Sequence, residues 1–142
     1  MKILVLAVGK LKEKHWAAAE ADYLDRLQHY AHVEVREVRD EPALIAALPA
    51  RARLVALDER GETLSSEEIA RRVLYAHEAH GGGAPLCFAI GGAEGHGAAV
   101  RGRAERLIAF GRITLPHRLA RVVLLEQLYR GYTILRGEPY HK

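Results

Sequence analysis

Cysteine and serine are scarce in this sequence, and each shortage argues against one kind of chemistry. Cys87 is the single cysteine, so the chain can form no internal disulfide. It lies within the apolar run PLCFAI, where a small buried thiol is a better interpretation than a nucleophile. The only serines, Ser65 and Ser66, belong to a helix-capping pattern that ends at Glu68, and no Gly-x-Ser-x-Gly elbow is present. Nucleophilic hydrolysis is therefore poorly supported.

Long hydrophobic runs are missing too. No apolar stretch approaches the roughly 20 residues that span a bilayer, and the run that follows Lys2 is too short for a secretory signal. We therefore expect no membrane partner and, with so little cysteine, a cytoplasmic location. Two histidine pairs, His29 with His32 and His77 with His80, have no cysteine or carboxylate set to complete a metal site, so no metal is expected.

The remaining composition is that of a soluble globular protein. The chain has 142 residues, 49% of them hydrophobic and 27% charged, which predicts a single domain spanning residues 1–142. Its net charge of +3 is compatible with an RNA or phosphate partner but is too small to establish one. Arginines are dense between Arg101 and Arg136, where only Glu105 and Glu126 oppose them. A solvated arginine-rich surface explains this density as well as nucleic-acid binding does.

Strand-like and helix-like segments alternate along the chain. Apolar runs, alternation and helical periodicity predict strands at residues 3–8, 33–38, 53–58, 85–90 and 113–115, and helices at residues 15–30, 65–80, 98–109 and 119–134. The second strand alternates and should lie at an edge. The piece around Pro42 and Pro49 should be mostly loop, with room for a turn or two of helix. This order predicts an α/β fold, with a mainly parallel sheet and helices on both faces.

Ligands of such folds bind beyond the carboxyl ends of the strands, and three of these ends are unusual here. ALDERGE follows the third predicted strand, IGGAEGHG the fourth and TLPH the fifth. The glycine-rich loop lacks the Gly-Lys-Ser/Thr of a Walker loop, and Val100 stands where a dinucleotide loop needs glycine. The loop either binds a ligand or makes a tight turn with Glu94 near a helix N-terminus. Asp58 and Glu59 are either an acid pair or turn residues before Gly61.

The last predicted helix is apolar around most of its circumference. Its apolar residues are Leu119, Val122, Val123, Leu124, Leu125, Leu128 and Tyr129. Such a helix is either buried nearly all round, against its own domain and a partner subunit, or is a core helix with a few solvated edges. Glu126, Gln127 and Arg130 interrupt the apolar surface, and burial would require them to be paired.

Four blocks of the sequence, in order, resemble the large-subunit ribosomal RNA methyltransferase H family of the SPOUT superfamily. The blocks are KILVLAVGK, VALDERGE, FAIGGAEG and ITLPHRLARVVLLEQLYRGYTILRGEPYHK, and the resemblance covers essentially the whole chain. It implies an α/β knot, in which the C-terminal segment threads through a loop as a trefoil knot, and a homodimer with active sites at the subunit interface. It also implies methylation of N3 of a pseudouridine in helix 69 of 23S rRNA, on the ribosome, with S-adenosylmethionine as methyl donor.

The matching motifs carry over the functional residues of the family. The cofactor would be bound by Leu57 in VALD, Gly91 in IGG, and the run Phe110, Gly111, Arg112, Ile113, Thr114 and Leu115 ahead of Pro-His. Catalysis would fall to Tyr140 and His141 in the tail, with His117 and Arg130 as further contributors. The reaction needs them because the target ring nitrogen carries a proton, so that a base, or a cation favouring the N3 anion, should help.

Two features depart from the family pattern. The tail reads Tyr140-His141-Lys142, whereas family members often carry arginine last, so the final cation keeps its charge but loses a bidentate fork. The segment between Val38 and Arg53 is also shorter than in many members. Two alternatives stay open: a SPOUT methyltransferase with another RNA substrate, and a ribosome-associated dimer without catalysis.

Overall fold

Five parallel strands form the sheet of this protein, in the spatial order β2-β1-β4-β3-β5. The computed structural model describes residues 1–142, and its strands are β1 (Lys2–Val8), β2 (His32–Val38), β3 (Arg53–Thr63), β4 (Leu86–Ile90) and β5 (Arg106–Ala109). Every pairing between neighbours is parallel, and β2 lies at an edge, as its alternating sequence predicts. The predicted α/β fold with a mainly parallel sheet is therefore confirmed.

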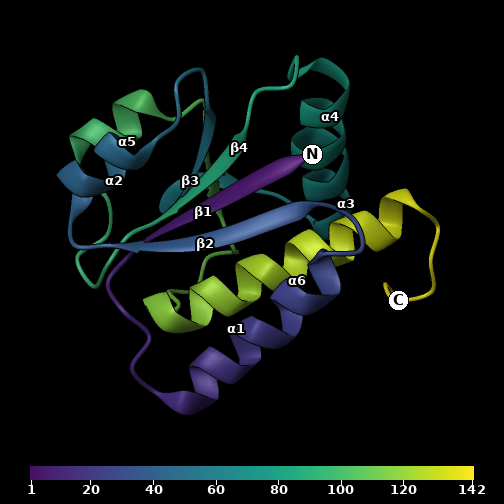
Figure 1. Ribbon diagram of the computed structural model, residues 1–142, viewed down its shortest axis with the longest axis horizontal. Helices are drawn as coiled ribbons and strands as arrows, with labels where there is room; N and C mark the ends of the chain where they lie inside the picture. Colours follow the sequence, from purple (N-terminus) through teal and green to yellow (C-terminus); the bar gives the residue numbers. More distant parts are fainter.

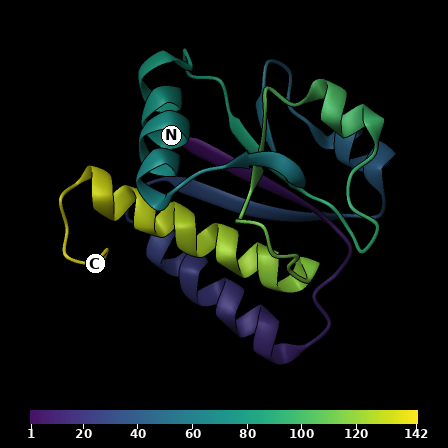
Figure 2. The same cartoon turned by 180° about the vertical axis from the view of Figure 1, so that it is seen from behind.

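Helices cover both faces of the sheet (Figure 1). They are α1 (Lys14–Leu27), α2 (Glu41–Ala47), α3 (Ser66–Glu68), η1 (Ile69–Tyr75), α4 (Ala76–His80), α5 (Ala98–Arg103) and α6 (His117–Leu135). α1, α6 and the continuous helix formed by α3, η1 and α4 pack on one face, and α2 and α5 pack on the other; Figure 2 shows the same layers from behind. None of these helices has the length and apolar character that crossing a membrane requires.

The strand β1 shows why the sheet needs cover on both sides. Ile3 and Val5 belong to the larger core, under α1 and α6, while Leu4 and Leu6 belong to the smaller core, under α2 and α5. All four side chains are at most 2% exposed. Because each fully buried aliphatic side chain contributes about 1.5–3 kcal/mol, this uninterrupted apolar run stabilises both layers.

Local sequence signals set two of the helix starts. The Ser65 hydroxyl accepts from the Glu68 amide at 3.1 Å, and the Glu68 carboxylate accepts from the Ser65 amide at 3.0 Å. This capping box is the one that the sequence predicts. Asp40 accepts from the Ala43 amide at 2.9 Å and caps α2, so the loop-rich segment does contain a short helix.

The helix predicted at residues 98–109 is wrong in its second half. α5 stops after 6 residues, and β5 occupies positions that the helical pattern assigned to an inward face. A short apolar run fits either period, and pairing with β3 decides here, since Leu107 lies opposite Ala56 in the parallel ladder. The strand predicted at residues 113–115 is likewise wrong, because these residues form a loop in which Ile113 is 72% exposed.

The strand β3 bends around β5 and contacts it twice. Ile108 lies opposite Leu57 in the first part of β3 and opposite Glu62 in the second part. Gly61 permits this approach, because a Cβ at that position would lie 2.5 Å from the Leu107 carbonyl carbon. The bend leaves the turn after Leu57 at the same end of the sheet as the ends of β4 and β5.

Candidate active site

A cavity of about 580 Å³ lies at the carboxyl ends of β4 and β5, beside the bend of β3 that follows Leu57. Its wall consists of residues 57–59, 90–96, 108–111 and 113–117, together with Arg101 and Ala120. The three stretches that stand out in the sequence, ALDERGE, IGGAEGHG and TLPH, therefore meet in one place. This is the position at which open α/β sheets bind their ligands.

Seven of the eight predicted cofactor residues line this cavity. They are Leu57, Gly91, Phe110, Gly111, Ile113, Thr114 and Leu115. The eighth, Arg112, is exposed and does not belong to the wall. Three segments that are far apart in the sequence thus reach one cavity, although the last of them is a loop and not the predicted strand.

The glycine-rich loop folds tightly against the end of β4. Gly92 and Gly95 form an antiparallel bridge, with Gly95 at a φ of 76°. A Cβ on Gly91 would lie 2.8 Å from the Gly95 carbonyl carbon, so this close approach requires glycine. His96 holds the end of the loop, with its Nε2 atom 3.1 Å from the Ala89 carbonyl oxygen. The loop is a tight turn, and its inner surface is also cavity wall.

Glu41, and not Glu94, accepts the hydrogen bond at the start of α5. The Gly97 amide donates to the Glu41 carboxylate at 2.6 Å. Glu59 and Glu94 are exposed and line the cavity, and the buried Asp58 lines it as well. The cavity wall therefore carries three carboxylates against one guanidinium, that of Arg101, and this excess of negative charge suits a ligand with positive charge.

Asp58 forms an ion pair with Arg101 at the edge of the cavity. The Arg101 guanidinium donates to the Asp58 carboxylate at 2.7 Å, and the Asp58 side chain is only 2% exposed. The other carboxylate oxygen accepts from the Arg60 amide at 2.9 Å. Burial alone would raise the pKa of Asp58, but the Arg60 amide and the Arg101 guanidinium hold that pKa below its usual value. Asp58 is thus a charged residue fixed by its partners, and no local pattern in the sequence predicts its pairing with Arg101.

Polar residues of α6 and the C-terminal tail form a second cluster. Arg130 donates to Glu126 at 2.7 Å, and the Tyr140 hydroxyl donates to the same carboxylate at 2.8 Å. Gln127 donates to Glu126 at 2.7 Å and accepts from the Ser66 hydroxyl at 2.6 Å. The three polar residues that interrupt the apolar helix are therefore paired within one chain, as their cost of burial requires.

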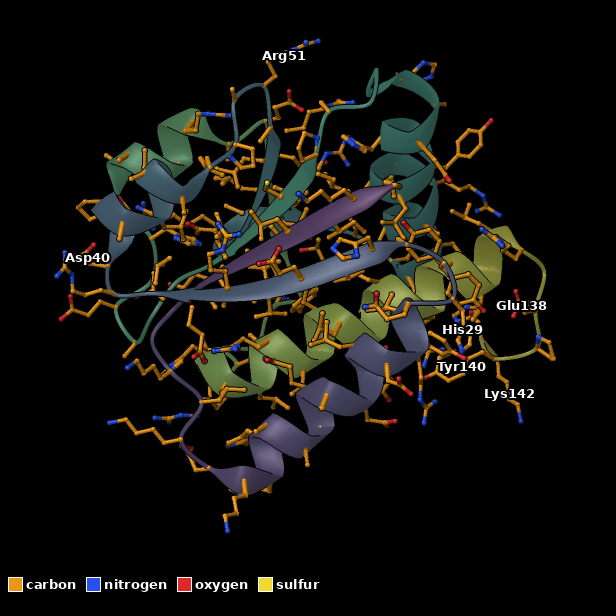
Figure 3. The ribbon with its side chains drawn as sticks, viewed as in Figure 1. His29, Asp40, Arg51, Glu138, Tyr140 and Lys142 are labelled. Atoms are coloured by element: carbon orange, nitrogen blue, oxygen red, sulfur yellow. The ribbon has the colours of Figure 1, made fainter.

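The tail residues of this cluster are held closely. The Tyr140 ring meets the Tyr129 ring edge-on at 4.7 Å, and the Arg130 guanidinium lies 4.9 Å from the centre of the Tyr140 ring. Burial and hydrogen bonds involving Tyr23 and Glu126 raise the pKa of Tyr140, so its hydroxyl stays protonated. Lys142, the departure from the family tail, is exposed and points away from the body of the protein (Figure 3).

The four predicted catalytic residues do not meet within one chain. His117 lines the cavity at the first residue of α6. Arg130, Tyr140 and His141 lie at the other end of the helix, which is about 20 Å away along the axis at about 1.5 Å per residue. Figures 1 and 2 show the tail at the opposite end of α6 from the cavity loops. Within a single chain, the cavity and the tail cluster are therefore separate sites.

The fold is that of a SPOUT methyltransferase, and the cavity lies where such α/β folds bind their ligands. The family model described as "Predicted SPOUT methyltransferase" matches residues 1–141, and the chain belongs to this family. Over its full length the chain is similar to proteins named "Ribosomal RNA large subunit methyltransferase H". The one from Anaeromyxobacter sp. is 46% identical with 100% of both chains covered, and the one from Geotalea daltonii is 42% identical with 99% of both covered.

Solved structures support the same fold at low sequence identity. A probable methylase family protein from Haemophilus influenzae has a TM-score of 0.62 and 8% identity, covering 99% of this chain and 70% of that chain. The SpoU methyltransferase AviRb from Streptomyces viridochromogenes, solved in complex with AdoMet, has a TM-score of 0.54 and 14% identity. That match covers 92% of this chain and 58% of AviRb.

Proposed function

We propose that this protein methylates large-subunit ribosomal RNA with S-adenosylmethionine, at N3 of a pseudouridine in helix 69 of 23S rRNA on the ribosome. The observation that carries the proposal is the gathering of seven motif residues around one cavity. Full-length identity of 42–46% to proteins named as ribosomal RNA methyltransferases supports the RNA class of the substrate. The pseudouridine and the helix follow from the motifs of the tail, which resemble those of the family.

The cavity fits S-adenosylmethionine in size and chemistry. Ligand pockets for molecules of this size measure about 300–1,000 Å³, and this cavity measures about 580 Å³. Leu57, Phe110 and Leu115 supply apolar surface for the adenine, and the Gly91 loop brings backbone groups close to the ligand. Asp58 is already paired with Arg101, and the carboxylates of Glu59 and Glu94 complement the positive charges of the amino group and the sulfonium. When bound, this cofactor supplies a methyl group on a positively charged sulfur.

We further propose that the active site is shared between two copies of the chain. Within one chain the cavity and the tail cluster lie about 20 Å apart along α6, which is too far for both to act on one ring nitrogen. The tail cluster of one protomer would therefore complete the cavity of the other. Several apolar residues of α6, among them Val122 and Val123, are only partly buried and could contact the second copy. The family's trefoil knot remains a prediction, and the double contact of β5 with β3 is compatible with it.

The tail would supply the proton chemistry. N3 of the substrate loses a proton as it gains the methyl group, and His141 is the candidate base. Arg130 and Tyr140 carry N–H and O–H donors that can stabilise negative charge on the ring. His117 lines the cavity, and burial together with the nearby Arg118 and Arg121 lowers its pKa, so it is neutral near pH 7. In-line alignment of the methyl group with N3 would supply much of the remaining rate.

Methyl transfer from labelled S-adenosylmethionine to ribosomes of a strain that lacks the modification tests the proposal. We expect label in 23S rRNA and, by mass mapping, at a single pseudouridine. Replacing His141→Ala should lower single-turnover methylation while cofactor affinity, measured by calorimetry, stays nearly unchanged. Label in another RNA would favour a different SPOUT substrate, and the lack of any cofactor binding would favour a ribosome-associated dimer without catalysis.

A further inference from the structure

Glu67, in the first turn of the helix that begins with α3, contacts the tail directly. Its Oε1 atom lies 2.7 Å from Nε2 of His141, although the two residues are 74 positions apart in the sequence. The neighbouring Glu68 makes the capping box, so Glu67 is not needed for the helix start. Neither the sequence motifs nor the proposed reaction gives Glu67 a role.

The contacts of His141 determine which of its ring nitrogens carries the proton. Nη1 of Arg130 lies 2.9 Å from Nδ1 of His141. A guanidinium can only donate hydrogen bonds, so Nδ1 must accept and must be unprotonated. The proton therefore sits on Nε2, which donates to the Glu67 carboxylate. A doubly protonated ring would place its Nδ1–H against an Arg130 N–H, so the imidazole is neutral in this arrangement.

The Glu67 carboxylate is suited to this task. Hydrogen bonds from its own backbone amide and from His141 lower the pKa of Glu67, which keeps the group charged near pH 7. A charged carboxylate can accept from Nε2–H but cannot donate to it, which excludes the other neutral tautomer. The same carboxylate would stabilise the imidazolium that forms when Nδ1 gains a proton, which is the role of the carboxylate in histidine-based triads.

We propose that Glu67 is the positioning residue for His141: it holds the proton on Nε2 and leaves the basic lone pair on Nδ1. The inference rests on the proposed methylation of a ring nitrogen. In that reaction Arg130 moves off Nδ1, the N3–H bond of the base breaks, and its proton forms an Nδ1–H bond on His141. The electron pair left on N3 forms the bond to the transferred methyl group, while the bond between that methyl group and the sulfonium sulfur of S-adenosylmethionine breaks and its electron pair stays on the sulfur.

The first test is the nitrogen-15 NMR spectrum of the His141 ring in the full-length protein. We expect the wild type to show a protonated Nε2 and an unprotonated Nδ1. Because Arg130 also favours this tautomer, the effect of Glu67 is measured in an Arg130→Met background, where Glu67→Ala should produce exchange between the two tautomers. A wild-type ring protonated on Nδ1 would overturn the inference, as would an Arg130→Met spectrum that Glu67→Ala leaves unchanged. This readout does not depend on activity, so it remains decisive if the wild type proves not to methylate ribosomes, a result that would reject the proposed function alone.

The second test is single-turnover methylation of ribosomes. Glu67→Ala should slow methyl transfer at least about tenfold, since a mispositioned base forfeits part of its contribution, while cofactor affinity and thermal unfolding stay unchanged. Glu67→Gln keeps an acceptor oxygen and should lose less than Glu67→Ala. Glu78→Gln is the matched control, an exposed carboxylate on the same continuous helix, and should leave the rate unchanged. An unchanged rate in Glu67→Ala, or a loss that follows cofactor affinity or unfolding, would contradict the positioning role.

Discussion

Arg101 of α5 donates a 2.7 Å hydrogen bond to Asp58 of β3 across the edge of the cavity. The pair joins the turn after the first part of β3 to the helix that follows the glycine-rich loop. Both residues line the cavity, so the contact fixes the distance between two of its walls. It is also the point at which the stability of the fold and the shape of the site depend on the same two side chains.

Replacing Arg101→Gln should lower the stability of the fold and weaken cofactor binding. The change leaves a carboxylate that is 2% exposed without its cation. Because removing one partner of a buried pair is strongly destabilising, and because Arg101 is partly exposed, we expect a loss of about 2 kcal/mol in the free energy of unfolding. Urea denaturation measures this loss, and calorimetry should show weaker cofactor binding. Arg103→Gln, on the same helix but outside the cavity wall, should leave cofactor affinity unaltered.

Acid should destabilise the protein through Asp58 and Glu126. Both have a pKa below the usual value in the folded chain, so each binds fewer protons there than in the unfolded chain. Their contribution is complete above the unfolded pKa, near 4, and is lost as the pH falls through the lower folded value. Unfolding free energies measured between neutral and strongly acidic pH should fall over this window. Arg101→Gln should show a shallower fall, and an equal slope in both proteins would contradict the assignment.

Gly61→Ala should disrupt the edge of the sheet. The added Cβ would lie 2.5 Å from the backbone carbonyl carbon of Leu107, and backbone cannot move aside as a flexible side chain can. We expect a loss of about 1–3 kcal/mol in the free energy of unfolding, because overpacking of this kind typically costs that much. Thermal unfolding checks it. Gly102→Ala, with open space around its Cβ, is the control and should change little.

Arg121→Met should lower the free energy of unfolding far more than Arg118→Met, a change one turn away on the same helix. The Arg121 side chain is 4% exposed and bridges Glu20 of α1 at 2.8 Å and Glu37 of β2 at 2.9 Å. Its removal leaves two carboxylates facing each other, at a cost of about 3 kcal/mol or more. Arg118 makes a more exposed pair with Glu13, so Arg118→Met should cost less than about 1 kcal/mol. Comparable losses in the two variants, measured by urea denaturation, would contradict this ranking.

Mixed dimers would test whether two chains share one active site. A Gly91→Val chain has a distorted cavity loop, because its side chain would clash with the Gly95 backbone, and an intact tail. A His141→Ala chain has an intact cavity and a defective tail. If the tail of one copy serves the cavity of the other, refolding the two inactive chains together should restore about a quarter of the wild-type activity, because half of the dimers are mixed and each has one complete site. If each chain uses its own tail, no mixture will recover activity.

Much of the fold follows from local patterns in the sequence. The apolar run of β1, the alternation of β2 and the Ser65 capping box each predict their element because the signal lies within a few residues. β5 could not be predicted in this way. Its 4 residues fit a helix as well as a strand, and only pairing with β3, some 50 residues earlier, selects the strand.

The candidate site likewise has a part that could be predicted from the sequence and a part that could not. The cavity residues could be named from the sequence because the motifs that resemble those of the methyltransferase family are each continuous in the chain. The contacts between charged groups could not. Asp58 is 43 positions from Arg101, and His141 is 74 positions from Glu67, and no local pattern couples residues at such separations. These contacts could not be predicted because the residues are far apart in the chain, although the chemistry of each pair is ordinary.

The length of α6 sets the distance and the relative orientation of the cavity and the tail cluster. It is 19 residues long, with the cavity wall at its first turn and the tail cluster near its last. Inserting one residue in the middle would lengthen it by only about 1.5 Å but would rotate Arg130 by about 100° relative to His117. The number of residues between His117 and Arg130 is therefore constrained separately from their identity, and an insertion should disrupt the proposed site even at positions of the helix where a substitution is tolerated.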